Sequence, residues 1–220
     1  MRTRQDPHER VAPAALDPLR AEARAYYDAR VATYGATPAG VDWNSEASQT
    51  LRFEQLARLW EREPEATVLD YGCGYGALAI YIRQRGHTGS YVGFDLSDAM
   101  VTEARRCLAP WADCQVTTDP AVLVPADYAV ASGVFNVKQG IDDAAWHAYV
   151  LDGLAHLATL GTKGFAFNLL TAHSDAEKRR ADLYYADPFA LFDHCRRTYS
   201  QRVALLHDYP LYEFTILVRR

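Results

Sequence analysis

The sequence predicts an α/β fold built on a mostly parallel, doubly wound sheet, and three observations carry the prediction. Short apolar runs alternate with helical patterns from residue 66 onward. A glycine-rich segment, residues 72–76, joins the first of these runs to a helical stretch. Two later runs, 202–207 and 212–218, are separated by only four residues. That connection is too short for the crossover between parallel strands, so this pair forms an antiparallel hairpin.

The region before the first strand is expected to be helical. Residues 1–17 show no periodic pattern, and we expect a flexible tail there. Asp17 and Pro18 have the chemistry of an N-cap and a first helical residue, which predicts a helix over 18–34. A second helix is expected over 45–62. We therefore divide a single domain, 18–220, into a helical segment or lid, 18–64, and a core, 65–220. No residue decides whether helix 18–34 is a lid or a dimer contact, and the oligomeric state stays open.

Strands and helices then alternate along the core. The expected parallel strands are 66–70, 90–95, 114–117, 128–132 and 163–168. The expected helices between them are 77–85, 97–108 and 142–160. This alternation places helices on both faces of a parallel sheet.

Length, charge and composition limit the classes of function that the sequence allows. A length of 220 residues, 49% apolar and 23% charged, suits one ordinary globular domain. The net charge is −5, and we interpret the short basic runs 178–180, 196–197 and 219–220 as solvated helix ends or tails, so no nucleic-acid partner is expected. No apolar run is long enough for a membrane span and the first residues lack a signal pattern, which predicts a cytoplasmic protein. The four cysteines lack metal-site spacing, so no metal is expected.

The glycine-rich segment and two acids indicate an adenosine-containing cofactor. Asp70 ends the first strand two positions before Gly72, and Gly74 and Gly76 follow. Glycines let the backbone approach a ligand closely, and the helix after them offers free N–H groups. Asp95 ends the next strand, where a carboxylate can accept hydrogen bonds from ribose hydroxyls.

Two cofactors fit this pattern, and the residues favour one of them. The spacing Gly72-x-Gly74-x-x-Ala77 also satisfies the dinucleotide fingerprint, so a nicotinamide-dependent oxidoreductase is an alternative. The carboxylate of Asp70 suits a ligand with a cationic end and would repel a pyrophosphate. Together with the terminal hairpin, this favours S-adenosylmethionine. We interpret Cys73 as a small residue beside the ligand rather than as a nucleophile.

From about Thr67 to Val218 the sequence resembles the class I S-adenosylmethionine-dependent methyltransferases. Residues 68–76, VLDYGCGYG, are similar to their first motif and residues 92–97, VGFDLS, to their second. The resemblance implies a seven-stranded sheet whose last strand is antiparallel. A largely uncharacterised bacterial subgroup is also similar, on the segments 40–45, 51–55, 132–136 and 207–214.

The resemblance also implies where the cofactor lies. Asp70 and the Gly72–Gly76 loop would meet its methionine part, and Asp95 its ribose. The residues implied near the adenine or along the rest of the cofactor are Leu96, Met100, Thr118 or Asp119, and Ser132, Gly133 and Phe135 within the segment 132–136.

Two residues of the helical segment extend this set. Arg52 could pair with the cofactor carboxylate or lie on a helix surface. Trp43 could close over the cofactor or belong to the core.

Methyl transfer requires few catalytic groups, because its main demand is to align a nucleophile about 3 Å from the methyl carbon. No catalytic residue is fixed by the sequence. His173 is a candidate base or a solvated loop residue, and Tyr184 and Tyr185 could wall an aromatic or cationic substrate or simply pack.

We expect a small-molecule acceptor, because the chain is acidic and no recognition domain is evident. The alternatives are a protein or RNA acceptor, the oxidoreductase, and a cofactor-binding module without catalysis. An Asn/Asp-Pro-Pro-aromatic signature, typical of enzymes that methylate nucleic-acid amines, is absent after the fourth strand.

Overall fold

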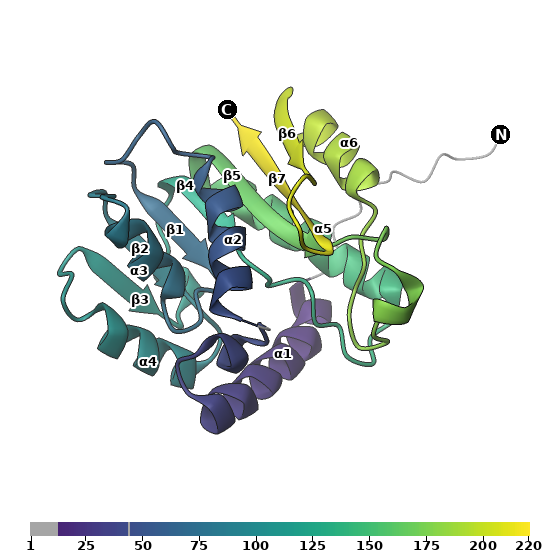
Figure 1. Cartoon of the computed structure of the whole chain (residues 1–220), viewed down its shortest axis with the longest axis horizontal. Helices are drawn as coiled ribbons and strands as arrows, with labels where there is room; N and C mark the ends of the chain where they lie inside the picture. Colours follow the sequence, from purple (N-terminus) through teal and green to yellow (C-terminus); the bar gives the residue numbers. More distant parts are fainter. Residues whose placement is uncertain (1–12, 44) are drawn as a thin grey trace.

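The computed structural model describes residues 13–43 and 45–220, which form a seven-stranded sheet with helices on both faces (Figure 1). The strands are β1 Val68–Tyr71, β2 Tyr91–Phe94, β3 Cys114–Thr117, β4 Ala126–Ala131, β5 Gly161–Leu170, β6 Arg202–Leu206 and β7 Glu213–Arg219. Their order across the sheet is β3-β2-β1-β4-β5-β7-β6. The predicted α/β class and the seven strands are confirmed.

The last strand is the only one that runs against the others in this sheet. β7 pairs antiparallel with both β5 and β6, whereas the four pairings among β1 to β5 are parallel. β6 and β7 thus form the predicted antiparallel hairpin, with β7 on its inner side. The register sets Asp70 opposite Gly93 of β2 and Val130 of β4. The carboxyl ends of the three strands β2, β1 and β4 therefore lie side by side.

Six α-helices accompany the sheet in the described residues. They are α1 Pro13–Tyr34, α2 Glu46–Ala57, α3 Ala77–Gln84, α4 Asp98–Leu108, α5 Asp143–Leu160 and α6 Pro188–Thr198. Side chains cap several of them: Ser97 accepts a hydrogen bond from the N–H of Met100, and Asp142 accepts from Ala144 and Ala145. These caps explain why helices 97–108 and 142–160 could be predicted closely.

Two helix boundaries differ from the prediction, and one helix was not predicted. α1 begins at Pro13 and carries Pro18 inside it, so the predicted start at Asp17 and Pro18 is wrong. The rest of the expected tail, 1–12, lies outside the described residues. α2 ends at Ala57 rather than near residue 62. α6 was not predicted, although Asp187 is its N-cap and Pro188 its first residue.

Alternate residues of the central strands enter two separate hydrophobic layers. Leu69 of β1 packs with Leu154 and Leu157 of α5, while its neighbour Val68 packs with Leu56 of α2 and Leu78 of α3. All six side chains are buried. Burying each contributes about 1.5–3 kcal/mol. This two-sided burial holds the strand ends in fixed positions.

The helix α1 lies across the carboxyl ends of β1 and β2 (Figure 1). The guanidinium of Arg24 donates to the backbone carbonyl of Leu96 at 2.5 Å, and the Ser97 hydroxyl donates to the carboxylate of Asp28. These contacts join α1 to the start of α4. No helix among the described residues is long and apolar enough to cross a membrane.

Candidate active site

A cavity lies where the carboxyl ends of β1, β2 and β4 meet α1. It encloses about 860 Å³ of space, part of it open to solvent. In open α/β sheets this is the position at which ligands bind. Predicted site residues that line it are Trp43, Asp70, Gly72, Cys73, Gly74, Asp95, Leu96, Met100, Ser132 and Gly133.

The floor of this cavity is the glycine loop after β1. Gly72, Gly74 and Gly76 all have positive φ, at +83°, +52° and +83°. A Cβ atom on Gly72 would lie 2.4 Å from Cγ2 of Val134, which no real side chain tolerates. The N–H groups of Gly72 and Cys73 donate to the carbonyl of Phe94, at 2.7 and 2.9 Å. The loop is thereby folded against β2, and Gly76 starts α3 without itself lining the cavity.

Asp70 is a buried carboxyl group with one free oxygen. It is 2% exposed, and its Oδ2 accepts a hydrogen bond from the Tyr91 hydroxyl at 2.7 Å. Its Oδ1 has no partner among the described residues. Burial, opposed by the Tyr91 hydrogen bond, raises the pKa of Asp70 to about 7. A buried carboxyl group in this state favours a cationic ligand, because a positive charge would stabilise its ionised form.

Asp95 is held by backbone donors from two segments. Its Oδ2 accepts from the N–H of Gly74 at 2.8 Å, and its Oδ1 accepts from the N–H of Ser97 at 2.9 Å. Burial raises the pKa of Asp95, and the two hydrogen bonds oppose that shift. Each carboxylate oxygen keeps a second lone pair for a ligand hydroxyl.

The end of β4 forms the opposite wall. The N–H of Gly133 donates to Oδ1 of Asn168 at 2.7 Å, which fixes the chain as it leaves the sheet. Gly133 has φ +71°, and a Cβ atom there would lie 2.2 Å from the ring of Trp43. The Oγ of Ser132 is buried without a partner among the described residues. Glycine at 133 therefore lets Trp43 pack directly on the backbone.

A second cavity adjoins the first and encloses about 990 Å³, also partly open to solvent. Both are lined by Tyr27, Val41, Trp43 and Gly133. Further walls come from the segment after β4, which contributes Asn136, from the segment after β5 and from the connection before β7. The last two contribute Ser174, Lys178, Arg180, Tyr185 and Tyr212. The residues 178–180, which we interpreted as a solvated run, contribute two side chains to this wall.

Arg52 lies on the second cavity and not on the first. Its guanidinium donates to both carboxylate oxygens of Glu213, at 2.7 and 2.6 Å, and to the carbonyl of Ser48 at 2.7 Å. Its Cζ also lies 3.8 Å from the centre of the Trp43 ring. Each guanidinium nitrogen therefore has a protein partner. The structure places Arg52 behind Trp43, and its pairing with a cofactor carboxylate stays a prediction.

Several predicted residues lie outside both cavities. Phe135 is fully buried beneath α5, where it contacts Gly153 and Tyr149, and it does not line the first cavity, where it was expected. Thr118 and Asp119 follow the edge strand β3, and the Asp119 carboxylate caps a short turn. Neither lines the cavity where adenine was expected.

The three candidate catalytic residues lie in different environments. Tyr184 is buried in the core, with its hydroxyl 2.8 Å from Nδ1 of His147. His173 is exposed and lines neither cavity. Tyr185 alone faces the second cavity. Trp43, for which core and cofactor contact were both open, lies between the two cavities.

The sequence interpretation missed the contribution of α1. Ala23, Arg24 and Tyr27 line the first cavity. The sequence predicts a helix over 18–34, but nothing in its pattern reveals that Tyr27 faces a cavity. Burial raises the pKa of the Tyr27 phenol, and the nearby Asp42 adds to the shift. Among the described residues no group of three or more His, Cys, Asp or Glu could hold a metal ion.

Comparison with known proteins places this geometry in a family. A family model described as a methyltransferase domain matches residues 43–207. Rv1506c of Mycobacterium tuberculosis, whose methyltransferase name is itself provisional, is 49% identical over 154 residues, or 70% of this chain and 93% of the relative.

Solved structures share the fold at low identity. The magnesium protoporphyrin IX methyltransferase of Synechocystis PCC 6803, with bound SAM, has a TM-score of 0.61 at 18% identity, covering 91% of this chain and 97% of that one. A DhpI-SAM-HEP complex has a TM-score of 0.62 at 17% identity, covering 92% and 98%. The family model and the 49% identical relative each cover most of the chain. The chain therefore belongs to the methyltransferase-domain family, as its resemblance to class I methyltransferases predicted.

Proposed function

We propose that this methyltransferase uses S-adenosylmethionine to methylate a small-molecule acceptor. The observation that carries the proposal is the pair of adjoining cavities, one built on the glycine loop and the other open beside it, with Trp43 and Gly133 in both walls. The first cavity suits the cofactor and the second the acceptor. Solved structures of the same fold contain SAM or SAH, which supports this assignment.

The polar groups of the first cavity fit the two ends of the cofactor. The free Oδ1 of Asp70 can accept a hydrogen bond from the cationic amino group, and Gly72 and Gly74 leave room for the methionine part. Asp95 can accept hydrogen bonds from the ribose hydroxyls. Leu96 and Met100 follow in the wall and give the adenine an apolar contact.

The bound cofactor supplies a methyl group on a sulfonium, which needs no further activation. The task of the chain is then to align the acceptor and to exclude water. Trp43 packs on the Gly133 backbone at the junction of the cavities, and α1 covers it. Tyr27 is the one titratable side chain among the four residues that line both cavities. Its raised pKa keeps the phenol protonated, so it can donate a hydrogen bond to the acceptor but cannot take its proton.

A small molecule suits the second cavity. Its volume, about 990 Å³ including space open to solvent, lies within the range of small-molecule sites. The nicotinamide-dependent alternative loses its support, because the chain belongs to a methyltransferase family and β7 is antiparallel.

Calorimetric titration of the purified protein with S-adenosylmethionine, S-adenosylhomocysteine and NADH tests the cofactor assignment. We expect the first two to bind and NADH not to bind. Asp95→Asn should weaken both by about 10- to 100-fold, because hydrogen bonds to a charged acceptor are lost. Asp119→Asn is the matched control, since Asp119 does not line the cavity. Binding of NADH alone, or equal affinities in the two variants, would contradict the proposal.

A further inference from the structure

We infer that the acceptor is a small organic anion, held at the outer end of the second cavity by Lys178. This inference rests on the proposed function, because it names the substrate class of that same site. Three features of the cavity support it: the pairing of its acids, the unpaired cation Lys178 and the amide donor of Asn136.

Each acid that lines the second cavity already has a cationic partner. Asp42 lies 3.0 Å from the guanidinium of Arg30, and Glu213 is paired through both oxygens with Arg52. These carboxylates therefore contribute little uncompensated negative charge to a ligand. The Asp175 carboxylate, close by, accepts a hydrogen bond from the Tyr212 hydroxyl at 2.5 Å.

More cationic than acidic side chains line the second cavity. Arg180 pairs with Asp182 through two hydrogen bonds. Lys178 lines the cavity, is exposed, and has no ion-pair partner in the described part of the chain. Arg179 beside it binds the carbonyls of Ala172 and Ser174 and lies over the Tyr185 ring, 5.4 Å from its centre. Among the residues that line the cavity, the pairs leave Lys178 as the unmatched charge; the neighbouring acids Asp175 and Glu177 lie outside this lining.

A neutral donor lies deeper in the same cavity. Asn136 is 5% exposed, and its Oδ1 accepts a hydrogen bond from the N–H of Leu170 at 3.2 Å. Its Nδ2 has no hydrogen bond within the described residues and is free to donate. An amide donor and an unpaired ammonium group together suit an oxygen-rich anion, a carboxylate or a phosphate-type group.

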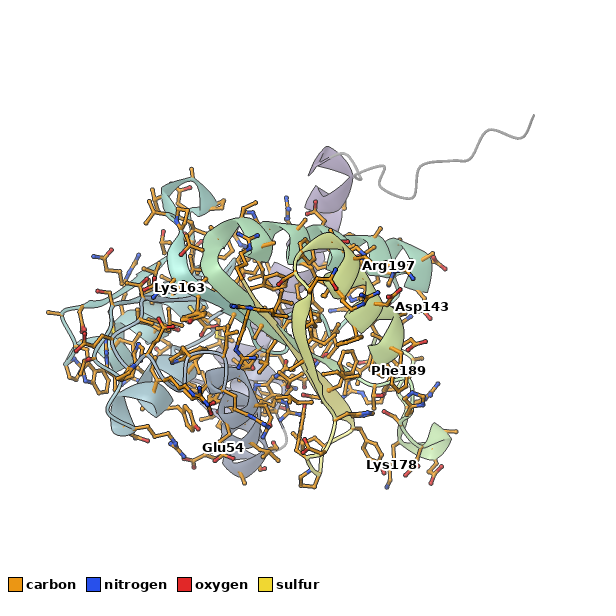
Figure 2. The ribbon with its side chains drawn as sticks, turned by 90° about the horizontal axis from the view of Figure 1, so that it is seen from above. Glu54, Asp143, Lys163, Lys178, Phe189 and Arg197 are labelled. Atoms are coloured by element: carbon orange, nitrogen blue, oxygen red, sulfur yellow. The ribbon has the colours of Figure 1, made fainter. Side chains whose placement is uncertain are left out.

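The position of Lys178 allows a matched control. The chain has three lysines, and Lys163 is another exposed one, paired with Glu63. Figure 2 shows the two well apart, Lys163 near the start of β5 and Lys178 on the segment beyond its end. The substitutions Lys178→Gln and Lys163→Gln remove the same charge and change the net charge of the protein equally.

The test measures binding of three aromatic probes by ligand-observed NMR: benzoate, phenylphosphonate and the neutral benzamide. We expect at least one anion to bind, benzamide to bind at least fivefold more weakly, and Lys178→Gln to weaken the anion by about 5- to 10-fold. Lys163→Gln should leave binding unchanged. Comparing the two anions separates a carboxylate from a phosphate-type acceptor, and added salt should weaken whichever binds.

Three results would overturn the inference: equal binding of benzamide and the anions, equal effects of the two lysine variants, or no binding of any probe. Calorimetry with S-adenosylmethionine on the same preparations reports on the cofactor separately. Loss of cofactor binding with intact, Lys178-dependent anion binding would refute the methyl-transfer function and leave an anion site. Intact cofactor binding without anion binding would refute the acceptor class alone.

Discussion

Replacing Gly133 by alanine should damage both the stability and the cofactor site. Gly133 has φ +71°, and adopting this conformation costs an alanine about 1–2 kcal/mol. The new Cβ would also lie 2.2 and 2.3 Å from two atoms of the Trp43 ring. Overpacking of this kind typically costs about 1–3 kcal/mol, and Arg52 stacked on the ring limits its freedom to move aside. We expect a total loss of about 2–5 kcal/mol in the free energy of unfolding.

The matched control is Gly86→Ala. Gly86 has a similar φ, +81°, but a Cβ atom there meets nothing within 4 Å. Urea denaturation should therefore show a loss of about 1–2 kcal/mol, the conformational part alone. Calorimetry should show S-adenosylmethionine binding weakened about tenfold in Gly133→Ala, because Trp43 is displaced, and unchanged in Gly86→Ala. If Gly133→Ala and Gly86→Ala had equal free energies of unfolding and both kept the wild-type cofactor affinity, the packing of Trp43 on Gly133 would be refuted.

Four further predictions concern three buried polar groups: Glu213, Asp70 and Cys73. Glu213→Gln should lower the free energy of unfolding by about 3–5 kcal/mol, because it leaves the Arg52 charge buried without its partner. The double variant Arg52→Met/Glu213→Leu should recover most of that loss, as measured by urea denaturation. Cofactor affinity should fall about tenfold per pH unit below about 7, because the ionised form of Asp70 binds the cationic amino group. Calorimetry from pH 5.5 to 8 should show a flatter dependence of affinity on pH for Asp70→Asn. In the free protein, the raised pKa of Asp70 means that the folded state holds a proton that the unfolded state has released between about pH 4 and 7. The free energy of unfolding should therefore fall as pH rises through this range. The fall should be smaller in Asp70→Asn. Cys73 should resist a thiol reagent in the native state, because burial raises the pKa of its thiol well above the ordinary value, and mass spectrometry of the labelled protein should find Cys73 unmodified. Rapid labelling of Cys73 would mean that the loop opens to solvent.

Local patterns explain why most of the fold could be predicted. The parallel strands β1, β2 and β4 are short apolar runs, and Ser97 and Asp142 mark the helix starts that they cap. α6 has a weaker signal, because its buried residues after the first are only Leu191 and Cys195. The Asp187-Pro188 pair at its start was a usable cue that the sequence interpretation left out.

The site was predicted where its residues follow one another in the sequence. Asp70, the glycine loop and Asp95 belong to one strand-helix-strand unit, so their meeting follows from chain order. Phe135 lies only two residues beyond Gly133, but the chain turns at positive φ and sends the Phe135 ring into the core. Arg52 meets Glu213 across 161 positions of sequence, a pairing that no local pattern reveals.

The placement of β7 between β5 and β6 has a consequence for synthesis on the ribosome. The strand that is made last occupies an interior position in the sheet, so β5 keeps an open hydrogen-bonding edge, rich in buried phenylalanine and leucine, until β7 emerges. Glu213 at the start of β7 is also the partner that holds Arg52. The nascent chain can assemble the first cavity from its first four strands, but the second cavity, which Glu213 lines, cannot be completed before the final strand docks. A chain stalled before residue 213 would present an aggregation-prone edge and an unpaired Arg52.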